Sequence, residues 1–220
     1  MAQMNGQEQA DGRSERERML AGELYNAGDQ QLADLRNKAH ELCRQYNALP
    51  ETAGQERAAI MRELVPSMGK ESEILGPVFF DYGIHTTIGE RVFANFNFSV
   101  LDVCPVIIGD NVMMGPNVSL MTPLHPLCFE DRNLREAADG SLFDYEYGAP
   151  ITIGSNCWLA ANVTVVGGVT IGEGSVIGAG SVVTHDIPAH SLAYGTPCQV
   201  VRQLTPADRM PLPQRVPERH

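Results

Sequence analysis

The sequence predicts a mainly β protein built as a parallel β-helix of six-residue repeats, with a short helical segment before it and one long loop excursion within it. The first observation is a six-residue period, in which units such as IGERVF (88–93), IGDNVM (108–113) and IGEGSV (171–176) each open on an aliphatic residue. The second is that Asn, Asp or Gly recurs within these units, where tight corners need residues that tolerate positive φ. A β-sandwich is the alternative, but sandwiches do not keep a strict six-residue phase.

The region before the repeats is expected to be helical. Residues 1–13 are polar and are predicted to be a disordered start. A helical segment is predicted over residues 14–76, with Asp29 as an N-cap and a third helix that stops near Pro66. One helix face is indicated by apolar residues at intervals of three and four, namely Leu32, Leu35, Ala39, Leu42 and Tyr46.

The repeats define the main domain over residues 77–204. Three hexads make one triangular coil of eighteen residues, so about four to five stacked coils are expected. The period fails from about residue 122 to 150, which predicts a loop excursion, and then resumes without a fault. The tail over 205–220 is rich in proline and is expected to be extended or disordered.

Charge and cysteine usage exclude several classes of partner. The chain has 16 Lys and Arg against 27 Asp and Glu, and residues 76–204 contain four arginines and no lysine. Nucleic acid and anionic membrane surfaces are therefore unexpected partners. No apolar run approaches the roughly 20 residues that cross a bilayer, and the start lacks a signal-peptide pattern. The five cysteines form no CxxC pair, so we expect reduced thiols and a cytoplasmic location.

Four segments carry a family resemblance: MLAGELYNAGDQQL (19–32), residues 79–118 with the motif FANFN (93–97), the isolated HP (125–126), and residues 151–204 with the motif NCWLAANV (156–163). Together they resemble the maltose and galactoside O-acetyltransferases, the sugar acetyltransferase branch of the hexapeptide-repeat acyltransferases. The resemblance implies a left-handed β-helix and transfer of an acetyl group from acetyl-CoA to a sugar hydroxyl. It also implies a homotrimer whose active sites lie between neighbouring β-helices.

Acetyl transfer needs a base for the attacking hydroxyl, and His125 is the candidate, because histidine titrates near neutrality and this one breaks the hexad phase at the mouth of the excursion. The resemblance places the catalytic base there; an exposed loop histidine is the alternative. Glu130 could orient the imidazole or be a solvated loop acid. Asn95 matches the polar residue beside the reacting centre, although a corner asparagine with positive φ is the alternative.

For the acceptor sugar, the resemblance implies contacts from Asp81, Asn95 and Asp102, with Asp29 as a further candidate. Val103 stands where the galactoside enzymes have a second acid. The segment LDVCP therefore favours a maltose- or glucose-like acceptor over a galactoside.

For the donor, the resemblance implies coenzyme A contacts from six residues of the later coils: Trp158, Ala161, Ala179, Thr184, His185 and Arg202. His185 replaces a family lysine, and Gln199 replaces an arginine. Both changes remove positive charge that would meet phosphates, so weaker coenzyme A binding is expected unless Arg202 compensates.

Other chemistries have less support in the sequence. His40 is expected to face solvent, and His85 and His190 to be corner or surface residues. No set of three histidines suggests a carbonic-anhydrase-like zinc site, so no metal is expected to be required. No cysteine stands in a nucleophile motif, which leaves direct transfer. The alternatives that remain are a non-sugar acceptor on the same fold and a non-catalytic trimeric scaffold.

Overall fold

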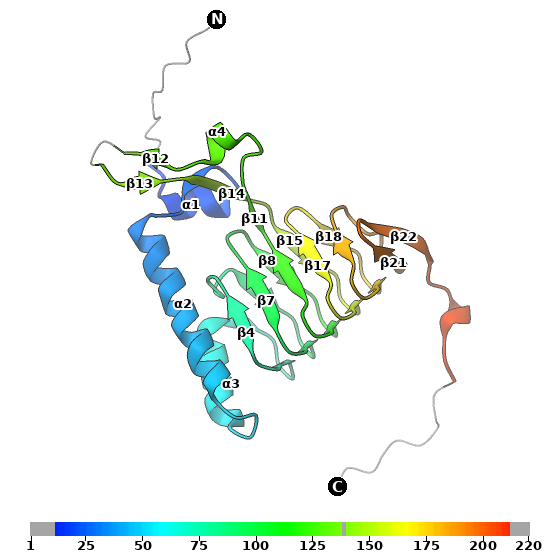
Figure 1. Cartoon of the computed structure of the whole chain (residues 1–220). Coiled ribbons are helices and arrows are strands. Elements are labelled where there is room, and N and C mark those ends of the chain that lie inside the picture. Colours follow the sequence, from blue (N-terminus) through cyan, green and yellow to red (C-terminus); the bar gives the residue numbers. More distant parts are fainter. Residues whose placement is uncertain (1–11, 138–139, 212–220) are drawn as a thin grey trace, which may run out of the picture.

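The computed structural model describes residues 12–137 and 140–211, and its body is a parallel β-helix with three flat faces (Figure 1). The first face stacks β2 (Ser67–Met68), β5 (Thr86–Ile88), β8 (Val106–Ile108), β15 (Ile151–Ile153) and β18 (Thr170–Ile171). The second stacks β3 (Glu73–Ile74), β6 (Phe93–Ala94), β9 (Met113–Met114), β16 (Trp158–Leu159), β19 (Val176–Ile177) and β21 (Ser191–Gly195). The third stacks β4 (Val78–Phe80), β7 (Phe98–Leu101), β10 (Ser119–Met121), β17 (Thr164–Val166) and β20 (Val182–Val183).

The aliphatic residue of each hexad points into the coil, as the period predicts. Ile108, Leu120, Leu159 and Val165 are among the residues with at most 1% of their surface exposed. The corners carry asparagines with positive φ, including Asn97, Asn117 and Asn162. Their side-chain amides form a ladder from coil to coil, because Asn97 Nδ2 donates to Asn117 Oδ1 and Asn117 Nδ2 donates to Asn162 Oδ1, each at 2.9 Å.

The β-helix begins earlier than residue 77. Strands β2 and β3 already form two sides of a first coil, in register with β5 and β6. Their corner is turned by Glu71 at φ 58°, much as Arg91 at φ 55° turns the corner of the next coil. Ser72 replaces the valine that the next two coils have at this position, and this disguises the hexad in the sequence. Five or six strands therefore stack on each face, which is more than the four to five coils expected.

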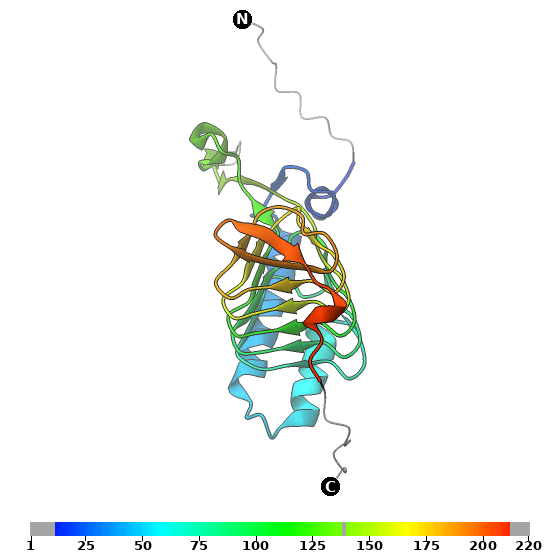
Figure 2. The same ribbon diagram turned by 90° about the vertical axis from the view of Figure 1, so that its right-hand side faces the viewer.

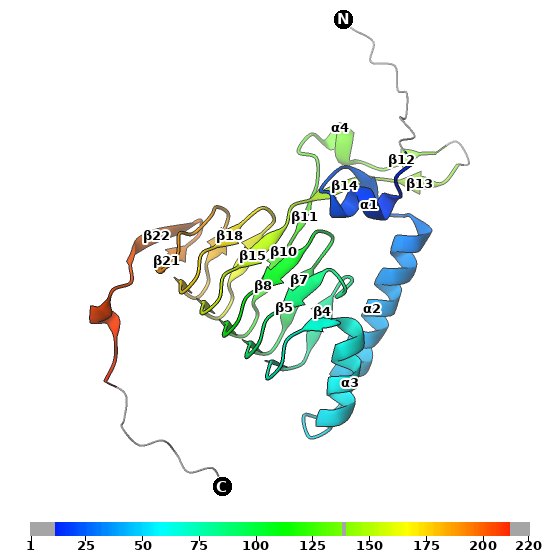
Figure 3. The same cartoon turned by 180° about the vertical axis from the view of Figure 1, so that it is seen from behind.

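The helical segment covers the N-terminal end of this stack (Figures 1 and 3). It contains α1 (Glu15–Leu20), the short strand β1 (Tyr25–Asn26), α2 (Gln30–Ala48) and α3 (Gly54–Leu64). Asp29 caps α2 by accepting from Leu32 N at 3.2 Å, as predicted. The buried face of α2 is the predicted one with Cys43 added; Leu35 is only partly buried.

Two side chains of α2 complete the hydrogen bonds of the first coil. The Asn47 amide behaves like a strand neighbour, since Nδ2 donates to Val78 O at 2.9 Å and Oδ1 accepts from Val78 N at 2.8 Å. The Tyr46 hydroxyl donates to Ile74 O. The free edge of β3 and β4 is thus partly closed by the helix above it.

The far end of the stack is closed differently. Strand β22 (Cys198–Gln203) turns back and pairs antiparallel with β21. A 3₁₀ turn follows at Pro206–Asp208, and residues 212–220 of the predicted proline-rich tail lie outside the described residues, as do residues 1–11 of the predicted disordered start. No helix in the described part of the chain is both long and apolar enough to cross a membrane.

The excursion leaves the third face after β10 and stands beyond the outline of the coils (Figure 2). It contains β11 (Pro123–Leu124), α4 (Phe129–Arg132), β12 (Arg135–Glu136), β13 (Leu142–Phe143) and β14 (Tyr145–Gly148). β14 pairs antiparallel with β11 on one side and with β1 on the other. The three strands form a small sheet, hereafter the side sheet, which joins the excursion to the N-terminal segment.

Candidate active site

His125 lies at the end of β11, at the mouth of the excursion, and 44% of its side chain is exposed. The pairing of β11 with β14 runs Pro123 opposite Gly148 and Leu124 opposite Tyr147. Continued by one residue, this register sets His125 opposite Glu146. Its Nε2 lies 4.0 Å from Glu146 Oε1. The position of the predicted base is therefore set by β pairing at the edge of the rigid coils.

Glu146 is the acid beside the imidazole, and the sequence analysis missed it. Tyr25 pairs with Glu146 from the other side, so Tyr25, Glu146 and His125 form one row across the side sheet. The buried Tyr25 hydroxyl donates to Glu146 Oε2 at 2.7 Å. Burial, followed by the bond to this carboxylate, raises the pKa of Tyr25 far above its usual value, so the phenol stays a donor.

Glu130, which was chosen because it follows His125 closely in sequence, lies elsewhere. It is exposed on α4, and its carboxylate makes no hydrogen bond or ion pair with any other described residue. Only its backbone oxygen is used, as an acceptor for Arg135 Nη2 at 3.1 Å.

His125 also has a second acid nearby. Asp144 lies two residues before Glu146, on the same face of the side sheet, and the ligand atoms of His125, Asp144 and Glu146 all lie within 4.8 Å of one another. One imidazole and two carboxylates could hold a divalent cation. This group could not be recognised from the sequence, because its members come from opposite ends of the excursion.

Asp81 follows β4 on the third face. The strand register aligns Phe80 with Val100 and Val100 with Leu120, so Asp81 lies at the same corner of the β-helix as the point where the excursion leaves. Its Oδ1 lies 3.5 Å from His40 Nε2, and His40 is exposed, as expected. Burial raises the pKa of Asp81, and the His40 contact opposes that effect.

Asp102 is placed differently from the other acceptor candidates. It has no exposed surface, and its carboxylate accepts hydrogen bonds from the backbone of Tyr82, Gly83 and His85 and from the Thr86 hydroxyl, at 2.8–3.3 Å. Each of the two carboxylate oxygens of Asp102 therefore accepts two hydrogen bonds from this chain. In this structure Asp102 shapes the turn that follows Asp81 and presents no oxygen to a sugar.

His85 lies in the turn before β5, which fits the expected corner position, but it is buried and not at the surface. Its Nδ1 lies 2.9 Å from Asp102 O and its Nε2 lies 3.3 Å from Arg16 Nη2. Because a guanidinium can only donate, the ring must accept at Nε2 and donate at Nδ1. Burial lowers the pKa of His85, which favours this neutral ring. His190 is a corner residue with φ 56°, as expected.

Asn95 and Asp29 each keep part of their bonding capacity. Asn95 follows β6, and its Oδ1 accepts from Phe96 N at 2.8 Å, while its Nδ2 makes no hydrogen bond with another described residue. The positive-φ corner there is Asn97, so the alternative interpretation of Asn95 does not hold. Asp29 uses one carboxylate oxygen for its capping bond.

The donor candidates lie on the later coils. Trp158 projects outward from β16 with 51% exposed, between Met113 and Val176 of the neighbouring strands. Ala161 and Ala179 lie at adjacent levels, since Gly180 N donates to Ala161 O at 2.9 Å. Thr184 Oγ1 lies 2.9 Å from His185 Nδ1.

Arg202, the remaining cation among the donor candidates, is already paired. Its Nη1 and Nη2 donate to the Asp208 carboxylate at 2.9 and 2.6 Å. This bidentate contact lowers the pKa of Asp208 to about 2. A phosphate of coenzyme A would have to compete with Asp208 for Arg202. This agrees with the expectation that positive charge contributes little to coenzyme A binding.

A stack of hexads with a histidine at the mouth of its one excursion defines the class of hexapeptide-repeat transferases. The family model described as "Bacterial transferase hexapeptide (six repeats)" matches residues 150–185, and the "Maltose acetyltransferase hexapeptide capping motif" matches residues 18–69.

Known proteins narrow the class to one family. The galactoside O-acetyltransferase of Escherichia coli is 37% identical over 193 residues, covering 88% of this chain and 91% of the relative. The crystal structure of a maltose O-acetyltransferase from Clostridium difficile has a TM-score of 0.82 at 40% identity, covering 88% and 98% of the two chains. A galactoside acetyltransferase in complex with coenzyme A has a TM-score of 0.81 at 36% identity, covering 89% and 94%. The chain belongs to the maltose and galactoside O-acetyltransferase family, and the predicted left-handed β-helix fold is confirmed.

Proposed function

We propose that this protein transfers an acetyl group directly from acetyl-CoA to a hydroxyl of a sugar, with His125 as the general base. The observation that carries the proposal is the cross-strand row of Tyr25, Glu146 and His125, which holds a carboxylate 4.0 Å from an exposed imidazole. The complexed coenzyme A of the structural relative supports the donor, and the relatives' sugar acetyltransferase activities support the acceptor class.

The imidazole has a free nitrogen for this task. In the ring orientation of the structure Nε2 faces Glu146, and Nδ1 makes no hydrogen bond with a described residue. The acceptor hydroxyl gives its proton to the imidazole as its oxygen attacks the thioester carbon. The resulting imidazolium is stabilised by Glu146. When the carbon–sulfur bond breaks, the proton passes to the leaving thiolate, so the histidine returns to its neutral form.

The acceptor is proposed to bind at the corner shared by Asp81 and the excursion. Asp81 offers an acceptor for sugar hydroxyls at this corner, and Asp29 is a further candidate. The free Nδ2 of Asn95 lies at the corner between β6 and β7, so its contact with the sugar would come from a neighbouring subunit. A maltose- or glucose-like sugar remains the favoured acceptor, on the strength of the LDVCP segment. Asp102 is not among these proposed contacts, because it is fully buried in the fold.

The donor is proposed to bind along Trp158, Ala161, Ala179, Thr184, His185 and Arg202. The outward stack of Met113, Trp158 and Val176 offers an apolar strip for the pantetheine arm. The histidine lies on the side sheet, which leaves the β-helix after the third face, whereas Trp158 lies on the second face. A homotrimer in which one subunit presents His125 to the donor strip of its neighbour would bring them together, and we propose this assembly.

A cation bound by His125, Asp144 and Glu146 is incompatible with this mechanism. With a metal on Nε2 the neutral ring carries its proton on Nδ1, so Nδ1 cannot accept the proton of the hydroxyl, and the two acids would neutralise the cation instead of the imidazolium. Direct transfer therefore requires no metal. Full activity after chelation with EDTA is expected; loss of activity that is restored by zinc would refute the metal-free mechanism.

The proposal is tested by an assay of acetyl transfer to maltose, glucose, galactosides and amines, in which release of the coenzyme A thiol measures the rate. Maltose or glucose is expected to give the highest kcat/KM. His125→Ala should lower kcat by about 10²–10⁴-fold, the usual contribution of a general base. His190→Ala, at an exposed corner, is the matched control and should keep full activity. An active His125→Ala enzyme would contradict the proposed base, and an inert wild type would favour the scaffold alternative.

A further inference from the structure

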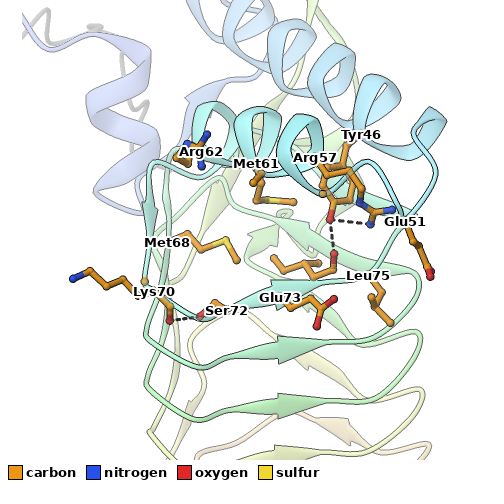
Figure 4. A pocket seen from close by; sticks show the side chains of 14 residues that line it. Tyr46, Glu51, Arg57, Met61, Arg62, Met68, Lys70, Ser72, Glu73 and Leu75 are labelled. Atoms are coloured by element: carbon orange, nitrogen blue, oxygen red, sulfur yellow. Dashed lines mark hydrogen bonds between the residues drawn. The ribbon is translucent and has the colours of Figure 1, made fainter. Parts of the chain in front are cut away.

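A separate pocket lies at the N-terminal end of the β-helix, between α3 and the first coil (Figure 4). Its volume is about 470 Å³, within the range of small-molecule sites. Met61, Met68, Ile74 and Leu75 give it an apolar lining. None of its lining residues belongs to the proposed catalytic, acceptor or donor sets.

Arg57 is the unusual member of this lining. Only 9% of its surface is exposed, and its guanidinium stacks 4.3 Å from the centroid of the Tyr46 ring. Its Nη2 donates to the Tyr46 hydroxyl at 2.9 Å, and that hydroxyl in turn donates to Ile74 O. Nε and Nη1 make no hydrogen bond, and Arg57 makes no ion pair, with any residue of 12–137 or 140–211.

A buried cation without a counter-ion is costly, and burial is normally accompanied by pairing. The ring and the hydroxyl of Tyr46 hold the Arg57 guanidinium in place at the wall of the cavity. Nη2 donates only one of its two N–H groups to Tyr46, and the other runs parallel to an N–H of Nη1 or of Nε, so a fork of two N–H groups is left to face an incoming ligand. That fork matches a carboxylate, which accepts two parallel hydrogen bonds from arginine.

The rim adds further positive charge. Arg62 and Lys70 line the pocket and are exposed, and neither forms an ion pair with a described residue. Lys70 is one of only two lysines in a chain of net charge -11; the other, Lys38, is paired with Glu63 at 2.8 Å. Glu51 and Glu73 also line the pocket. These two acids disfavour a multiply charged anion and leave a single negative charge as the best match.

We propose that this pocket binds a small monocarboxylate with an apolar chain. The carboxylate pairs with Arg57, and the chain packs against Met61, Met68 and Leu75. Such a ligand neutralises the buried guanidinium and removes its own methylene groups from water, so both halves of the molecule gain from binding. The site is independent of acetyl transfer.

Calorimetric titration of the full chain with sodium octanoate tests this site. Saturable binding of one octanoate per chain is expected, with butyrate and the uncharged octan-1-ol weaker. Arg57→Met should weaken octanoate binding at least about tenfold, which is 1.4 kcal/mol. Arg91→Met, which removes an exposed arginine paired with Glu90 in a later coil, should bind octanoate like wild type.

A second variant keeps the proposal testable should Arg57→Met fail to fold. Ala58→Trp fills the pocket from the exposed side of α3, leaves Arg57 in place, and should also abolish binding. Binding of octanoate to either variant as tightly as to wild type would overturn the proposal, as would the lack of saturable binding to wild type. Binding only by a Glu51→Gln, Glu73→Gln double variant would show that these acids neutralise Arg57, and would equally overturn it.

Discussion

The coils of the β-helix and the side sheet reach ordered structure by opposite routes. Each coil pairs with neighbours one repeat away, so the same contacts recur along the stack. The side sheet joins β1 to β14, and Tyr25 bonds Glu146 across 121 positions of sequence. Redundant local contacts support the scaffold, whereas a single row of long-range contacts supports the proposed base. Changes in the coils should therefore act on stability, and changes in the side sheet on catalysis.

The largest effect should come from a cavity within the coils. Leu159 has no exposed surface, and Leu159→Ala is expected to lower the free energy of unfolding by about 2–5 kcal/mol. Urea denaturation measures this loss, while kcat of the folded fraction should stay near that of wild type. The control Leu142→Ala, at an exposed position of the excursion, should change stability by less than about 0.5 kcal/mol. A comparable loss in both variants would break the distinction between the two regions.

Tyr25→Phe tests the side sheet. Removal of the hydroxyl leaves Glu146 without its donor, and hydrogen bonds to charged groups contribute about 1.5–3 kcal/mol, so kcat should fall about tenfold or more. The KM for acetyl-CoA should not change, because no donor contact is proposed there. Tyr147→Phe lies on the same strand but faces the other side of the sheet and should be neutral. Equal kcat values for wild type and Tyr25→Phe would show that Glu146 needs no positioning.

The asparagine ladder provides a smaller test within the coils. Asn117 has φ 60° and bonds both Asn97 and Asn162, so Asn117→Ala should cost about 1–2 kcal/mol for the left-handed backbone alone. Asn117→Gly relieves the backbone strain but still loses both amide bonds, and thermal unfolding should place it between Ala and wild type. An Ala variant as stable as the Gly variant would contradict the assigned role of positive φ.

The smallest effect is expected at Asp81, where the two regions meet. Burial raises the pKa of Asp81 in the folded state, so ionisation of this carboxyl opposes folding. The stability gained from the protonated carboxyl is complete below the unfolded pKa of about 4 and is lost as pH rises through the folded pKa. Asp81→Asn should therefore raise Tm at pH 7, and this gain should disappear in acid. Asp34→Asn, on the exposed face of α2, should show no such dependence on pH. A gain that persists in acid would assign the effect to packing.

This contrast also explains which features were predictable. The same residue pattern recurs in every hexad, so the coils, the inward aliphatic residues and the asparagine corners could be predicted from the sequence. The start of the β-helix was misplaced because Ser72 stands where the next two coils have Val92 and Val112, which hides the hexad pattern of the first coil. Asp29 as a cap could be predicted because a cap is decided within one turn of helix.

The acid beside His125 could not be found in this way. Glu130 was the nearest acid in sequence, but β pairing across the excursion brings Glu146 to the imidazole. The burial of Asp102 and His85 escaped prediction for the same reason. Their surroundings are supplied by α1 and by turns of neighbouring coils, and residue type alone does not reveal them.

The side chain of Asn47 has a consequence for behaviour at high concentration. The first and last coils of a stack of parallel strands each leave backbone N–H and C=O groups unpaired. The end coil of another chain can pair with these groups, and such addition can repeat without limit. Asn47 occupies the donor and acceptor of Val78, and at the other end β22 reverses the strand direction. An amide from a helix at one end and an antiparallel return at the other thus limit a repeat that could otherwise propagate as a fibre.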